Sequence, residues 1–340
     1  MTTLEERIGY IAQLGERMDN DSLLAAMIEG GQRLNPWFVP AFMQSAWEAV
    51  RGSMLNDSAL RLWLNAYSIP DQPRKLLRVG LVMAGNIPLV GFHDFLCVYL
   101  TGYKAQLKLS SKDDGLLLYL LDSLKKIDPG FSEQIQLVDK LTQFDAVIAT
   151  GSDNTNRYFE HYFRNYPAIL RRNRNSVAVL NGNETKEELE ALADDIFLYF
   201  GLGCRNVSKL YVPKDYDVRV LFPYFERYQW LHHHTKYMNN YDYNRTILLM
   251  NKTQHYSNDF VMLEEKNAIA SPIAVLYYET YENTEALTAA LQVAAPQIQC
   301  VVASPGVLPE VPTVVFGTAQ QPGLADYADG VDTIRFLISL

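Results

Sequence analysis

Hydrophobic and polar positions predict a helical region over residues 1–70. Thr3 and Glu6 have the spacing of a capping box, and Ile8, Ile11 and Leu14 follow at helical intervals. We expect the aromatic residues further along this region to be core: Trp37, Phe38, Phe42, Trp47 and Trp63.

The pattern changes after residue 76, where short apolar runs begin to alternate with helical stretches. The run 77–84 predicts a buried strand that ends in a loop at Gly85-Asn86. Further strands are expected at 103–109, 144–149 and 176–180, and helices at 89–100, 116–127 and 150–166. This alternation predicts a mostly parallel sheet with helices on both faces.

A second block of the same kind follows. Thr185 and Glu188 form another capping box, for a helix that we expect to end at Gly201. Strands are expected at 209–212, 273–278, 300–303 and 334–338, with a helix at 283–293. The chain is therefore expected to form two α/β lobes that meet near residues 180–205.

The composition argues against several classes of protein, among them nucleic-acid-binding, membrane-spanning and disulfide-rich proteins. The 340 residues are 48% hydrophobic and 20% charged, and the net charge of −9 argues against binding to nucleic acid or to an acidic membrane. No apolar stretch reaches the roughly 18 residues of a membrane span, and the first residues lack the pattern of a signal peptide. Three cysteines without a CxxC motif predict neither disulfides nor a thiolate zinc site. We therefore expect a reduced, cytoplasmic protein.

Cys204 is the first candidate for chemistry, because Gly201 and Gly203 precede it and would let a ligand approach the backbone closely. A cysteine of ordinary pKa is mostly protonated at neutral pH, so a nucleophile here needs activation by Arg205 or by a helix end. The alternative is a buried structural thiol, which the segment alone favours.

Three predicted strand ends carry further candidates. Asn86 follows the first strand and offers an amide donor for an oxyanion, although Asn before Pro is also ordinary turn chemistry. Lys108, Ser110, Ser111 and Lys112 could bind phosphate or ribose, or form a solvated strand end. Thr150-Gly151-Ser152 suits a pyrophosphate at a helix start, or a plain cap.

His232-His233-His234 invites a metal interpretation. Consecutive residues do not share one face of a helix, and on a strand only the first and third would. Without an obvious third ligand we predict no metal site, and we expect the tyrosines around the triplet to be core or a substrate wall.

Taken in order, these segments resemble the aldehyde dehydrogenase superfamily, and within it the LuxC type of acyl-CoA reductase. Gly85-Asn86-Ile87-Pro88 resembles that branch's G-N-V-P, and the segment 108–113 resembles its K-V-S-S-K-D. Ala149-Thr150-Gly151-Ser152 resembles the superfamily's F-T-G-S turn, and Gly203-Cys204 resembles the nucleophile loop. The segments 271–275 and 316–317 resemble later landmarks.

The resemblance implies a role for each motif. Cys204 would accept the acyl group, and Asn86 with the backbone N–H of Cys204 would form the oxyanion hole. Lys108, Ser110, Ser111 and Lys112 would hold the adenosine ribose and its 2′-phosphate, with Gly151 and Ser152 beside the pyrophosphate. It also implies a Rossmann-like cofactor domain with its helices at 1–182, a catalytic domain at 183–312, and a C-terminal segment, 313–340, returning to the core or to an oligomer interface.

Departures from the family pattern bear on the type of reaction and on the choice of cofactor. Arg171 stands where aldehyde-oxidising relatives carry the glutamate that activates water, so hydrolysis of an acyl-enzyme should be slow. Ser111 replaces the carboxylate of NAD-preferring relatives, which favours NADPH over NADH. Ala268 aligns with the glutamate that contacts the nicotinamide ribose, and Glu264 or Glu265 would substitute for it only with a gap.

The resemblance therefore implies NADPH-dependent reduction of an acyl-CoA, with a fatty acyl group, to an aldehyde through an acyl-cysteine. Two alternatives stay open: a non-acylating aldehyde dehydrogenase, and a catalytically silent subunit of an acyl-transfer complex. The expected partners are an acyl-CoA or acyl-carrier substrate, and a second copy of the chain or an acyl-activating enzyme.

Overall fold

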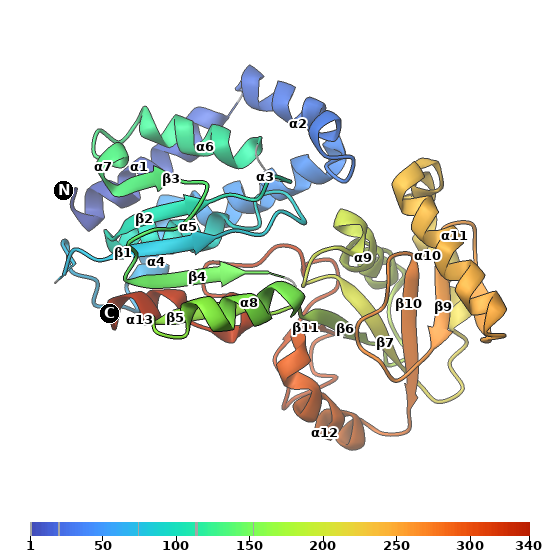
Figure 1. Cartoon of the computed structure of the whole chain (residues 1–340). Helices are drawn as coiled ribbons and strands as arrows, with labels where there is room; N and C mark the ends of the chain where they lie inside the picture. Colours follow the sequence, from blue (N-terminus) through green and yellow to red (C-terminus); the bar gives the residue numbers. More distant parts are fainter. Residues whose placement is uncertain (1, 20, 74, 113–114, 152) are drawn as a thin grey trace. The chain divides into compact units, whose positions relative to one another are not determined.

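The computed structural model describes residues 2–19, 21–73, 75–112, 115–151 and 153–340. The chain divides into two compact units, which are described separately below. The first contains residues 1–173 and 321–340, and the second contains residues 174–320 (Figure 1). The C-terminal residues thus return to the first unit.

Helices dominate the start of the first unit, as the sequence predicts. They are α1 (Leu4–Met18), α2 (Ser22–Leu34), α3 (Pro40–Met54) and α4 (Asp57–Leu64). The capping box of Thr3 and Glu6 is formed, and Ile8, Ile11 and Leu14 are buried. None of the helices in the described part of the chain is long and apolar enough to cross a membrane.

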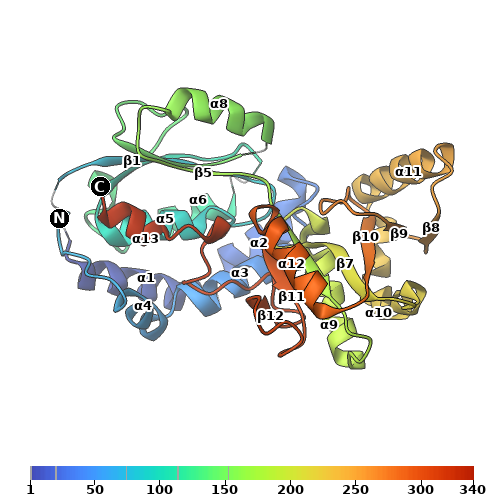
Figure 2. The same ribbon diagram turned by 90° about the horizontal axis from the view of Figure 1, so that it is seen from below.

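A five-stranded parallel sheet forms the centre of the first unit. Its strands are β1 (Arg78–Val82), β2 (Lys104–Lys108), β3 (Ile135–Leu137), β4 (Ala146–Thr150) and β5 (Ala168–Arg171), in the order β3-β2-β1-β4-β5. The connecting helices are α5 (Phe92–Thr101), α6 (Leu116–Lys125), α7 (Phe131–Gln134) and α8 (Asp153–Phe163). Figure 2 shows α8 on one face of the sheet and α5 and α6 on the other. The predicted fold class is confirmed.

Helix α5 is shorter than its sequence pattern predicts. Leu89 has a φ of 58°, a left-handed value that interrupts a right-handed helix, so α5 begins only at Phe92. It ends where predicted, at Gly102, whose φ of 79° suits a residue without a Cβ. The strands β3 and β5 were not predicted, because each is only three or four residues long.

The prediction of a strand at 334–338 is wrong. This segment is the helix α13 (Thr333–Ile338), and the side chain of Asp332 caps it by accepting a hydrogen bond from the N–H of Arg335. The buried residues Ile334 and Leu337 are three apart, which is helical spacing. The cap outweighs the strand propensity of a short apolar run.

The second unit is built on a seven-stranded sheet in the order β12-β11-β6-β7-β10-β9-β8. The strands are β6 (Asn175–Val179), β7 (Val207–Pro213), β8 (His255–Ser257), β9 (Met262–Glu265), β10 (Val275–Tyr281), β11 (Ile298–Val302) and β12 (Thr313–Val314). All pairs are parallel except β8 with β9. Its main helices are α9 (Lys186–Phe197), α10 (Phe222–Phe225), α11 (Thr235–Met250) and α12 (Thr284–Ala294).

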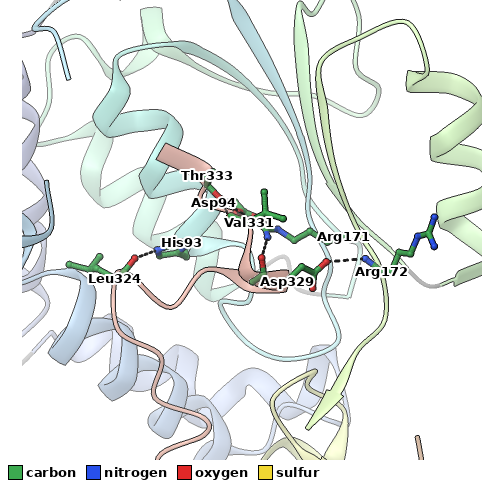
Figure 3. A network of polar contacts seen from close by, with 9 residues as sticks. His93, Asp94, Arg171, Arg172, Leu324, Asp329, Val331 and Thr333 are labelled. Carbon is green, nitrogen blue, oxygen red and sulfur yellow. Dashed lines mark hydrogen bonds and ion pairs between the residues drawn. The ribbon is translucent and has the colours of Figure 1, made fainter. Parts of the chain in front are cut away.

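A buried ion pair fastens the C-terminal segment to the first unit (Figure 3). The guanidinium of Arg171, at the end of β5, donates to Asp94 on α5 at 2.6 and 3.2 Å and to the hydroxyl of Thr333 at 2.9 Å. The side chains of Arg171 and Asp94 are only 4% and 14% exposed. Burial lowers the pKa of Arg171, but the Asp94 carboxylate more than offsets this, so the guanidinium stays charged.

We expect Arg171→Met to lower the free energy of unfolding by about 3–5 kcal/mol, because it leaves the Asp94 carboxylate buried without its partner. Urea denaturation followed by tryptophan fluorescence measures the change. The control is Arg172→Met, which removes an ion pair to Glu160 whose arginine side chain is 68% exposed and should cost less than about 1 kcal/mol. Equal losses in the two variants would contradict the structural role of Arg171.

Candidate active site

The segment that leads to Cys204 has an unusual backbone. The 3-10 turn η1 (Leu198–Gly201) follows α9, and its last three residues have φ values of 54°, 58° and 74°. Only Gly201 adopts this left-handed region without steric cost. Packing holds the other two, since Tyr199 and Phe200 are buried.

Cys204 itself lies at the corner of a tight turn. The backbone N–H of Asn206 donates to the carbonyl of Gly203 at 3.1 Å, which places Cys204 and Arg205 at the two central positions. Both central residues are half-buried, and β7 begins at Val207, directly after the last residue of the turn. The turn therefore leaves Cys204 partly exposed, unlike the fully buried Cys97.

A serine that was not predicted connects Cys204 with a second thiol. The hydroxyl oxygen of Ser176, on β6, lies 3.1 Å from the Cys204 carbonyl oxygen and 3.0 Å from the Sγ of Cys300. It also accepts the Cys300 N–H at 3.2 Å. A hydroxyl has one proton, so donation to the Cys204 carbonyl leaves Cys300 to donate its own S–H.

The third cysteine is unsuited to chemistry. Cys97 lies on α5 and is completely buried, and this burial raises the pKa of its thiol well above the ordinary value. It is therefore protonated and out of reach of a substrate.

Four aromatic residues around the histidine triplet are part of the core, whereas Tyr243 is exposed. Phe225, Tyr228, Tyr237 and Tyr241 are all buried. His234 caps α11 by accepting from the Tyr237 N–H, and its ring lies 4.4 Å from the ring of Phe200, centre to centre. In the part of the chain that the structure describes, no three potential ligands are grouped as a metal site. His234 thus packs against the segment that leads to Cys204, whereas His232 and His233 are exposed.

The predicted cofactor residues gather at one edge of the five-stranded sheet. Val82, the last residue of β1, lies opposite Lys108 of β2 on one side and opposite Ala149 of β4 on the other. The loops that follow these strands therefore leave from the same edge, and they carry the predicted residues Asn86, Ser110, Ser111, Lys112 and Gly151. Ser152 is outside the described residues.

This edge has features that suit a dinucleotide. The connecting helices change face between β1 and β4, and open α/β sheets bind ligands beside such a change. Asn86, Ser111 and Lys112 are exposed. A Cβ at Gly151 would lie 2.9–3.0 Å from Phe159 and Thr155, so this turn needs glycine to bring the backbone close to α8.

Neither of the two glutamate positions of the family pattern holds an equivalent group. Arg171, which the resemblance aligns with the water-activating base, donates a hydrogen bond from its guanidinium to Asp94 at 2.6 Å. Near Ala268, Glu264 is buried and pairs with Lys266 at 3.2 Å, whereas Glu265 is exposed.

Asp195 is a buried carboxylate on α9 that the sequence analysis missed. Its two oxygens accept the backbone N–H groups of Gly317 and Ala319 at 2.7 and 3.0 Å, which ties the segment after β12 to the helix. Burial raises the pKa of Asp195 to about 7, although these two donors act in the opposite direction. An acidic residue among the apolar positions of α9 was the available sequence signal.

Comparison with known proteins agrees with the motifs. The model of a family described as acyl-CoA reductase (LuxC) matches residues 65–220, which include Asn86, Gly151 and Cys204. No curated protein gives a significant match.

Solved structures share the fold at low sequence identity. Aldehyde dehydrogenase 21 from Physcomitrella patens, in complex with succinate, superposes with a TM-score of 0.65 at 11% identity, over 100% of this chain and 84% of its own. Indole-3-acetaldehyde dehydrogenase AldA of P. syringae gives 0.64 at 13%, over 89% and 72%. A Mycobacterium tuberculosis aldehyde dehydrogenase with NAD+ gives 0.64 at 12%, over 92% and 77%.

This chain therefore shares the fold of these aldehyde dehydrogenases. The segment 65–220, which carries the motifs of the sequence analysis, is similar to the acyl-CoA reductase (LuxC) family.

The raised pKa of Asp195 predicts a pH dependence of stability. A carboxyl whose pKa rises on folding stabilises the protein in its protonated form, so the contribution is present at low pH and is lost as the pH rises through about 7. Between pH 8 and pH 5 the wild type should gain about 2–3 kcal/mol more than Asp195→Asn. Urea unfolding at both pH values tests this, and an equal gain in the two proteins would refute it.

Proposed function

We propose that this protein reduces an acyl-CoA, or an acyl group on a carrier protein, to an aldehyde by means of an acyl-cysteine at Cys204. The observation that carries the proposal is the pairing of two features. Cys204 stands at the corner of an accessible turn, and the position of the usual water-activating base is an arginine neutralised by Asp94. An acyl-enzyme without such a base is protected from hydrolysis.

The first half of the reaction follows from the chemistry of the thiol. The Cys204 thiolate attacks the thioester carbonyl, and the oxyanion is stabilised by the amide of Asn86 and the N–H of Cys204. The C–S bond to CoA then breaks, and CoA leaves as a thiolate that needs little acid assistance. The acyl group is left on the Cys204 sulfur.

The second half needs a hydride, which NADPH supplies when bound. Lys108, Ser110, Ser111 and Lys112 would hold its ribose and 2′-phosphate, with Gly151 and Ser152 near the pyrophosphate. The residues present fit NADPH. Position 111 is a serine and not a carboxylate, and the cation Lys112 follows it. Gly151 has no Cβ, which allows the turn before α8 to stay close to that helix. The resulting thiohemiacetal on Cys204 collapses to aldehyde and thiolate, again with Asn86 at the oxyanion.

The remaining parts of the proposal come from the sequence. They are a fatty acyl group, a cytoplasmic location, and assembly with a second copy of the chain or with an acyl-activating enzyme. The solved aldehyde dehydrogenases with NAD+ support a nicotinamide cofactor.

The direct test is acyl-CoA-dependent oxidation of NADPH, with the aldehyde trapped as its hydrazone. Cys204→Ala should reduce the rate to background, while Cys97→Ala and Cys300→Ala should keep most of it. Rapid CoA-independent oxidation of an aldehyde by the wild type would instead favour the non-acylating reaction.

Asn86→Ala should lower kcat by about 10²–10³-fold, because it removes one of the two oxyanion donors. The matched control is Asn65→Ala, an exposed asparagine at the end of α4, which should leave kcat unchanged. An Asn86→Ala variant with wild-type kcat would remove Asn86 from the oxyanion hole.

Ser111→Glu should shift the cofactor preference toward NADH. The new carboxylate repels the 2′-phosphate of NADPH and accepts hydrogen bonds from the free ribose hydroxyls of NADH. We expect the ratio of kcat/KM for NADPH to that for NADH to fall by at least about tenfold, a change of about 1.4 kcal/mol. Lys125→Glu on α6 adds negative charge away from this edge and should leave the ratio unchanged. Equal effects of both variants would show a general field rather than a cofactor contact.

A further inference from the structure

We propose that Asn206 is the positioning residue of the nucleophile: its side-chain amide holds the turn that carries Cys204 in register with the end of α9. The inference rests on the proposed role of Cys204 and adds a residue that neither the motifs nor the family comparison assigns. The side chain carries four hydrogen bonds, and the residue is only 1% exposed.

The first bond closes the turn a second time. The Oδ1 of Asn206 accepts the backbone N–H of Gly203 at 2.8 Å, while the backbone N–H of Asn206 donates to the Gly203 carbonyl at 3.1 Å. Both polar groups of Gly203 are thus bound to the same residue. Cys204 is enclosed between two residues that are joined by two bonds, which restricts its backbone far more than a single turn bond would.

The other three bonds attach this closed turn to a helix end. The Nδ2 of Asn206 donates to the carbonyls of Asp195, Ile196 and Leu198 at 3.2, 3.3 and 2.8 Å. Carbonyls in the last turn of a helix have no partner within the helix, and when buried they need another donor. The amide supplies that donor from the turn itself, so the position of Cys204 is coupled to α9.

Two neighbouring features show why the turn needs the hydrogen bonds of Asn206. The connection between α9 and the turn runs through the left-handed residues Tyr199 and Phe200, a conformation that the local chain would not choose alone. On the other side, the Ser176 hydroxyl holds the Cys204 carbonyl from β6. Asn206 lies between these supports and bonds directly to the residue before the cysteine.

The amide of Asn206 also affects the electrostatic potential at Cys204. A helix C-terminus carries partial negative charge, which opposes a thiolate nearby. The two amide protons of Asn206 are directed at these carbonyls, whereas a carboxylate at the same place would add a further negative charge. Asparagine and aspartate, although equal in shape, are therefore predicted to differ in their effect on Cys204.

The test compares two rates on the same cysteine in the full chain: acyl loading from acyl-CoA, and alkylation by iodoacetamide at high pH, both measured by mass spectrometry. Acyl loading depends on the placement of the sulfur against the oxyanion donors, whereas alkylation of an ionised thiol depends mainly on access. Asn206→Ala should slow acyl loading by about 10- to 100-fold, with alkylation at high pH within threefold of the wild type.

Asn206→Asp provides a second readout and keeps the test valid if the alanine variant does not fold. Its oxygen can still accept the Gly203 N–H, but only a protonated carboxyl can donate to a carbonyl. Its acyl-loading rate relative to the wild type should therefore rise as the pH is lowered. Asn240→Ala is the control, because it also removes an asparagine bond to a backbone carbonyl of the second unit, that of Lys236 one turn earlier in α11.

The outcomes separate the two proposals. If folded Asn206→Ala loads acyl groups within twofold of the wild type, or if Asn206→Asp shows no pH-dependent recovery, Asn206 is not the positioning residue. If the wild-type Cys204 takes no acyl group at all, the proposed function itself is wrong.

Discussion

The hydrogen bonds between Gly203 and Asn206 fix the position of one sulfur atom, and the proposed chemistry depends on that position. A cysteine in a mobile loop could be alkylated by many reagents, but it would meet an oxyanion donor only occasionally. The turn at 203–206 is instead closed twice and attached by hydrogen bonds to α9 and β6. Rigid support of this kind is how a structure makes a single thiol catalytically useful.

A second constraint decides what happens to an acyl group once it is attached. Arg171 gives β5 a cation where a water-activating carboxylate would stand, and Asp94 neutralises it in a buried ion pair. The same guanidinium holds the C-terminal segment through Thr333. One residue thus serves the stability of the first unit and, under the proposed function, stands in place of the group that would favour hydrolysis of an acyl-enzyme.

Sequence patterns predicted those parts of the structure that local chemistry determines. The capping boxes at Thr3 and Thr185, the end of α5 at Gly102 and the parallel sheets all follow from short-range signals. The helix at 333–338 did not, because its cap by Asp332 was given less weight than an apolar run. The roles of Ser176, Asp195 and Asn206 also went unnoticed, since most of their hydrogen-bond partners lie between 8 and 124 residues away in the chain.

The most direct test of the account is mass spectrometry of the tryptic peptides after exposure of the native protein to acyl-CoA. Cleavage after lysine and arginine places Cys97, Cys204 and Cys300 on different peptides, so the modified thiol is identified without ambiguity. The account predicts an acyl mass on the peptide 187–205 that disappears when NADPH is added. An acyl mass on the Cys300 peptide, or a Cys204 adduct that NADPH leaves intact, would contradict it.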